Sequence, residues 1–159
     1  MQHVVDRVDP RCVEACSAFI RATLTLMSGI LLLIGIVFAA LAALLHVYIF
    51  VMESITWSSP ATWKRFGLAS QADADTTKPM ALNQGFYNLF LAIGTIVGLL
   101  LLIPVPAVGI TLVLFAVASM LAASLVLVIS SPRLARAAVT QGAFPLLAII
   151  AFVVALLAE

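Results

Sequence analysis

The chain has 159 residues, of which 64% are hydrophobic and 9% are charged, and its formal net charge is +1. Soluble domains carry about 25% charged residues, so this chain lacks the polar surface that a soluble domain needs. A near-neutral chain without a basic cluster also offers no footprint for nucleic acid. The composition therefore predicts an integral protein of the lipid bilayer and excludes a nucleic-acid-binding protein.

Residues 1–21 are polar and carry charges of both signs. This segment is expected to be a separate N-terminal lead-in, with a short helix that begins at Pro10. Cys12 and Cys16 form a C-x3-C pair, and His3 is the one other ligand type close by. A zinc site needs four ligands, so no metal site and no cofactor is predicted, and both thiols are expected to be free. The mixed charges and the long apolar run that follows argue against a cleaved signal peptide.

Four apolar stretches are long enough to cross a bilayer, which needs about 20 apolar residues. The first lies in an uncharged run between residues 22 and 52, and Pro104, Pro106 and Pro132 separate the later ones. The predicted spans are residues 27–51, 80–103, 107–130 and 137–158.

The main loop between the first two spans covers residues 53–79. Ser59 followed by Pro60 predicts a short helix, because serine is a good N-cap and proline suits the first helical position. Residues 70–78 are expected to be a polar connector, and Pro79 is expected to open the second span.

Short turns between the spans require neighbouring helices to run antiparallel. The fold class is therefore predicted to be all-α, a four-helix transmembrane bundle with up-down topology, formed by a single domain of residues 22–159. Gly94 and Gly98 give the second span a small-xxx-small face, which permits close helix contact.

Lysine and arginine favour the cytoplasmic side of a membrane. In the predicted topology the main loop and the turn at 131–136 share one side, which holds five cations against three in the lead-in. The main loop is therefore predicted to be cytoplasmic, with both termini outside. The five are Lys64, Arg65, Lys78, Arg133 and Arg136, and the three are Arg7, Arg11 and Arg21.

Polar residues gather in the cytoplasmic half of the predicted spans. His46 and Glu53 are seven residues apart, which is about 20° around an α-helix, and Phe50 and Trp57 are expected to lie on nearly the same stripe. The second span opens with four polar side chains over an arc of about 140°, too wide to face lipid. The predicted ligand-binding set is His46, Glu53, Trp57, Asn83, Gln84, Tyr87, Asn88 and Gln141.

Two interpretations of this set remain open. Ionisable residues inside a membrane indicate a functional site, whereas amides there often only join helices. A functional site favours a pocket for a lipidic or small-molecule ligand, or for a membrane protein partner or second copy. An alternative is a membrane enzyme of the isomerase or hydratase type, with His46 and Glu53 as catalytic acid/base candidates. A small-molecule transporter ranks third, because its carboxylate is expected near the middle of the bilayer.

These residues resemble a family of small bacterial integral-membrane proteins that is described as a domain of unknown function. The resemblance covers residue 35 to the end and implies a four-span protein of the inner membrane, without an activity. Met52-Glu53 inverts the order that the family favours. The motifs are His46-Val-Tyr-Ile-Phe, Met52-Glu53, Trp57-Ser-Ser-Pro60, Phe66-Gly-Leu68, Asn83-Gln-Gly-Phe-Tyr-Asn88 and Gln141-Gly142.

Overall fold

The computed structural model describes residues 10–158, except for the side chains of Pro10 and Cys12. Its described part contains four helices that are long and apolar enough to cross a membrane. This confirms the predicted all-α fold. The long helices are α1 (Pro10–Phe50), α3 (Gln71–Leu101), α4 (Pro106–Ser130) and α5 (Ala135–Leu157), and α2 (Pro60–Trp63) is a short helix between the first two.

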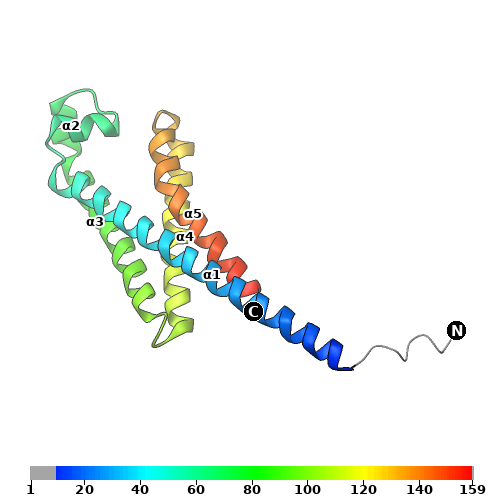
Figure 1. Ribbon diagram of the computed structural model, residues 1–159. Helices are drawn as coiled ribbons and strands as arrows, with labels where there is room; N and C mark the ends of the chain where they lie inside the picture. The colour runs from blue at the N-terminus through cyan, green and yellow to red at the C-terminus, as the bar shows by residue number, and fades with distance from the viewer. Residues whose placement is uncertain (1–9, 159) are drawn as a thin grey trace.

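The four long helices form an up-down bundle in which each packs against two neighbours. α1 contacts α3 and α5, and α4 contacts the same two helices from the other side. The α1–α3 and α4–α5 connections therefore lie at one end of the bundle, which we call the loop end (Figure 1). A tight turn between α3 and α4 closes the opposite end.

α1 is much longer than the predicted span. Its 41 residues extend about 60 Å at 1.5 Å per residue, and its first part projects away from the other helices (Figure 1). The short lead-in helix expected after Pro10 is instead continuous with the span, because neither proline nor glycine occurs between residues 11 and 28. Packing against the bundle starts at Ser28, close to the predicted start at residue 27.

α3 also begins earlier than predicted. Residues 70–78 were expected to be a connector, but residues 71–78 form the first turns of this helix. Ser70 is the N-cap, and its hydroxyl accepts a hydrogen bond from the backbone N–H of Asp73 at 3.1 Å. Pro79 therefore lies inside the helix rather than at its start. The other predicted boundaries agree within three residues with α4 and α5.

The core lies between α1, α4 and α5. Small residues on α1 face larger ones on the other two helices, with Phe152 of α5 fully buried. The predicted close contact at Gly94 and Gly98 is present, and it joins α3 to α4. The buried cluster comprises Ala39, Ala42, Val113, Val117, Met120, Ala148 and Phe152.

Candidate functional site

Glu53 lies in a π-helical turn that ends α1. The turn spans Val51–Ile55, and the backbone N–H of Thr56 donates to the Val51 carbonyl at 2.9 Å across five residues. Turns of this kind are rare and often occur at functional sites. The turn holds the Glu53 side chain buried, with 8% of its surface exposed.

The π-turn also changes the predicted facing of this segment. The expected stripe through Phe50 and Trp57 assumed 100° per residue, which the wider turn does not keep. Phe50 packs edge-on against Phe86 of α3, with ring centroids 5.3 Å apart. Trp57 lies beyond the helix, so the single stripe is wrong from residue 51 onward.

Asn88 of α3 is the partner of Glu53. Its Nδ2 donates to Oε2 of Glu53 at 2.9 Å and to the Gln84 carbonyl at 3.1 Å. Asn88 is itself 5% exposed. The buried carboxylate is therefore bonded to a neutral amide on the neighbouring helix.

Gly85 allows α3 to approach the π-turn this closely. A Cβ on Gly85 would collide with Oγ of Ser54 and would lie 3.1 Å from Cβ of Glu53. Ser54 also donates to the Leu82 carbonyl at 3.1 Å. The Glu53–Asn88 pair is thus built on a direct contact between the two helices.

His46 is fully buried on α1, seven residues after Ala39 and four after Ala42 of the core. Its Nδ1 lies 2.8 Å from the Ala42 carbonyl. A carbonyl can only accept, so Nδ1 carries the hydrogen, and in the neutral ring Nε2 is an acceptor. Nε2 is buried without a hydrogen-bond partner, and it is the one such side-chain atom in the described residues.

Trp57 fastens the main loop to α3. Its Nε1 donates to the Ala74 carbonyl at 2.9 Å, and its ring packs against Phe66 at 5.0 Å. Trp63 also joins the main loop to α3, because its Nε1 donates to Oε1 of Gln71 in the first turn of that helix at 3.1 Å. Trp57 is therefore a buried anchor of the loop end.

Four of the predicted residues are not buried. Asn83, Gln84 and Tyr87 are exposed on the single chain, and Gln141 of α5 is half-buried. The reason is helical spacing, since the buried face of α3 repeats every three to four residues. That face runs through Ala81, Gly85, Asn88, Ala92 and Thr95. An arc of 140° is wider than one buried face, so the prediction that all four polar residues of this helix turn inward does not hold within one chain.

Four buried hydroxyl residues were missing from the prediction, Ser28, Thr62, Thr95 and Ser124, and the last two lie at contacts within the bundle. Thr95 is fully buried seven residues after Asn88, and its Oγ1 donates to the Leu91 carbonyl at 2.9 Å. Ser124 of α4 packs against Gly142 of α5. The heptad spacing from Asn88 would have identified Thr95. The contact between Ser124 and Gly142 depends on the packing of two helices, which the sequence does not display.

Cys16 is free and exposed on α1. His3 and the side chain of Cys12 lie outside the described residues, so the C-x3-C pair stays a prediction. The residues that are described contain no group of three His, Cys, Asp or Glu side chains that could hold a metal ion.

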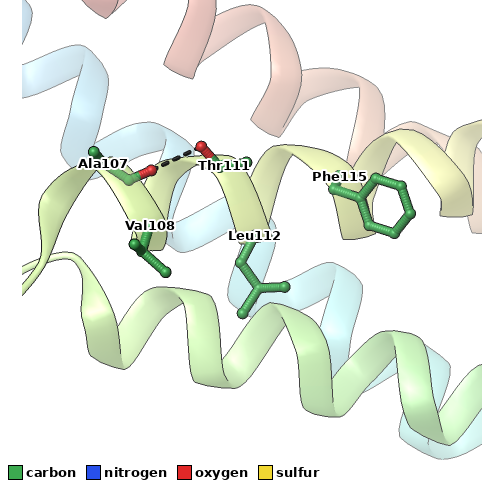
Figure 2. Close-up of a pocket in the computed structure, with 5 residues that line it drawn as sticks. All are labelled: Ala107, Val108, Thr111, Leu112 and Phe115. Atoms are coloured by element: carbon green, nitrogen blue, oxygen red, sulfur yellow. Dashed lines mark hydrogen bonds between the residues drawn. The ribbon is translucent and has the colours of Figure 1, made fainter.

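A pocket of about 460 Å³ lies on α4, a helix that carries none of the predicted ligand-binding residues. Figure 2 shows its five lining side chains on one helix. The hydroxyl of Thr111 donates to the Ala107 carbonyl at 2.7 Å, and the other four side chains are apolar. This open apolar groove shares no residue with the predicted ligand-binding set.

The fold and these contacts define a class: an all-helical bundle with four helices long and apolar enough to cross a membrane, and with buried polar residues near one end. Residues 40–153 match the family described as Protein of unknown function (DUF1304). This match covers more than half of the chain, so the chain belongs to that family. No curated protein and no solved structure matches the chain.

Proposed function

We propose that this chain is an integral membrane protein that binds the polar group of a lipidic or small molecule at His46, Glu53 and Asn88. The observation that carries the proposal is the buried, unpartnered Nε2 of His46. Buried polar atoms almost always have a partner, and leaving one without costs about 1–3 kcal/mol. A bound group would supply the missing partner.

The donor pattern limits the chemistry of that group. The lone pair of Nε2 requires a donor, such as a hydroxyl or an amine. The Glu53 carboxylate also accepts hydrogen bonds, and Asn88 engages its Oε2. The proposed ligand therefore presents O–H or N–H groups rather than an anion.

Replacement of the Glu53 carboxyl group by an amide tests this binding function. Wild type and the Glu53→Gln variant are purified in detergent, and bound molecules are detected by native mass spectrometry and organic extraction. We expect a stoichiometric small molecule on wild type and about tenfold lower occupancy on the variant, because glutamine replaces one acceptor oxygen by an NH2 donor and a hydrogen bond is worth about 0.5–1.5 kcal/mol.

The matched control is Glu14→Gln, which removes an exposed carboxylate from the projecting part of α1. It is expected to retain the molecule. Equal occupancy on wild type and Glu53→Gln, or no bound molecule on either, would count against a binding site and favour a purely structural pair.

The membrane placement is part of the same proposal. The family resemblance favours a bacterial inner membrane, and the lysines and arginines favour a cytoplasmic loop end with both termini outside. α1 is about twice as long as the hydrocarbon core of about 30 Å is thick. Its exposed first part therefore extends into the opposite interface or beyond.

Cysteine labelling tests the orientation. Ala69→Cys, at an exposed position in the main loop, is combined with serine at positions 12 and 16. A maleimide that does not cross membranes is expected to label it only after the inner membrane has been opened. Ile103→Cys, at a position that is 91% exposed in the opposite turn, is expected to react on intact spheroplasts. The reverse pattern would invert the topology.

A membrane enzyme is the second candidate, because two titratable side chains, His46 and Glu53, are buried near the same end of α1. General acid/base catalysis would require both to reach one substrate. A proton-coupled transporter is less favoured. Between residues 10 and 158 the other carboxylates, Glu14, Asp73 and Asp75, are exposed.

A further inference from the structure

Four exposed cations surround the loop end, on a surface that the proposed binding function does not use. Lys64 and Arg65 belong to a 3-10 turn (Lys64–Phe66) that follows α2. Arg133 belongs to a second 3-10 turn (Pro132–Leu134), and Arg136 to the first turn of α5. We call these four residues the basic rim.

Gly67 brings the two halves of the basic rim together. It adopts the left-handed conformation with φ of 78°, which ends the first 3-10 turn. A Cβ on Gly67 would lie 3.7 Å from Cδ2 of Leu134 and 3.8 Å from Nε of Arg133. The cations of the main loop and those of the α4–α5 connection therefore form one surface, although almost 70 residues separate them in the sequence.

Aromatic residues support two of the cations. Nζ of Lys64 lies 5.5 Å from the centroid of the Trp63 ring. Nη1 of Arg65 donates to the hydroxyl of Tyr48 on α1 at 2.7 Å. Tryptophan and tyrosine beside lysine and arginine are typical of the level of the lipid headgroups.

The acidic residues nearest in sequence are bonded to neutral groups. Neither residues 54–72 nor residues 76–158 contain an aspartate or glutamate. Asp73 accepts from Ser70 at 2.7 Å, and Asp75 accepts from Gln71 at 2.9 Å. Glu53 is buried and bonded to Asn88. The positive charge of the rim is therefore open to an external anion.

We propose that the basic rim binds the phosphate of an anionic phospholipid. The rim stands where helices long and apolar enough to cross a membrane reach their polar end. An arginine guanidinium can bind phosphate oxygens through two parallel hydrogen bonds, and lysine adds a point charge. A phospholipid also supplies acyl chains for the apolar helix surfaces below the rim, which free phosphate does not. This inference is independent of the binding site proposed at His46, Glu53 and Asn88.

Lipid titration tests the proposal. The full chain in detergent is titrated with phosphatidylglycerol and with phosphatidylcholine of the same acyl chains, and bound lipid is counted by native mass spectrometry. Wild type is expected to bind phosphatidylglycerol about tenfold more tightly. The double variant Arg133→Gln/Arg136→Gln is expected to bind both lipids equally, with its affinity for phosphatidylcholine unchanged.

A second pair, Lys64→Gln/Arg65→Gln, gives the same test on the other half of the rim if the first pair does not fold. The control is Arg21→Gln, in the projecting part of α1, which removes one exposed cation and is expected to keep the preference. Equal affinity of wild type for both lipids would overturn the proposal, and so would a preference that survives both pairs. Loss of the preference in the control, or displacement of the lipid by equimolar glycerol phosphate, would overturn it as well.

Discussion

Replacing Gly109 with alanine is expected to lower the free energy of unfolding by about 3 kcal/mol. A Cβ at this position would lie 2.6 Å from the backbone N of Leu102, 2.7 Å from the carbonyl C of Leu101 and 2.9 Å from the carbonyl O of Gly98. All three are backbone atoms, so no side chain can rotate away, and the turn between α3 and α4 must open. Unfolding by sodium dodecyl sulfate, followed by circular dichroism, measures the loss.

Gly29→Ala is the matched control, because no heavy atom lies within 4 Å of a Cβ built at Gly29. Alanine forms helix better than glycine by about 1 kcal/mol, so this variant is expected to be as stable as wild type or slightly more stable. Equal losses at the two positions would show that the α3–α4 contact does not limit stability.

The long helices were predictable because their signal is strong and local. Uncharged apolar runs predicted the long apolar helices. Pro106 predicted the start of α4, and Pro132 predicted the turn before α5. The start of α3 was not predicted. Ser70 is a good N-cap and Asp73 follows three residues later, but the polarity of residues 70–78 made that stretch look like loop. A helix that extends beyond the apolar region carries polar turns, and hydropathy alone cannot distinguish them from a connector.

The candidate site was predicted in its members but not in its geometry. His46, Glu53 and Asn88 were all named from the sequence, and all three are buried. The pairing of Glu53 with Asn88 depends on the π-turn at Val51–Ile55, which has no reliable sequence signal. It also depends on Gly85, whose role appears only when α1 and α3 are placed together. The exposure of Asn83, Gln84 and Tyr87 follows from the same helix spacing that buries Asn88.

The hydrogen bond between Asn88 and Glu53 suits both interpretations of the polar residues. Interhelical bonds of this kind hold membrane helices together, with an average of about 0.6 kcal/mol each, and a binding site needs its first residues held in place. The unpartnered Nε2 of His46, an atom outside this bond, supports the binding that we propose, because buried polar atoms almost always have a partner. Unfolding measurements on variants of Glu53 and Asn88 therefore test whether the pair stabilises the bundle, whereas ligand measurements on the same variants test whether it binds a molecule.

Asn88→Leu is expected to destabilise the protein by about 3 kcal/mol, because it removes the amide and leaves the Glu53 carboxylate buried without its donor. This exceeds the average of about 0.6 kcal/mol for an interhelical bond, since it includes the cost of the uncompensated acid. The double variant Glu53→Leu/Asn88→Leu is expected to recover part of the loss, because both polar groups are then absent. Titration with sodium dodecyl sulfate on Asn88→Leu, on Glu53→Leu and on the double variant gives the coupling free energy of the pair.

Asn83→Leu is the control on the same helix, because this amide is exposed and its replacement is expected to change stability by less than about 0.5 kcal/mol. Additive losses in the double variant would show that Glu53 and Asn88 do not interact in the membrane. A measurable coupling free energy between Glu53 and Asn88, together with an unstable Glu53→Gln variant, would show that the pair serves the stability of the bundle. Coupling together with a stable Glu53→Gln variant that has lost its bound molecule would establish that the carboxylate serves the ligand, since the amide of glutamine can still accept from Asn88.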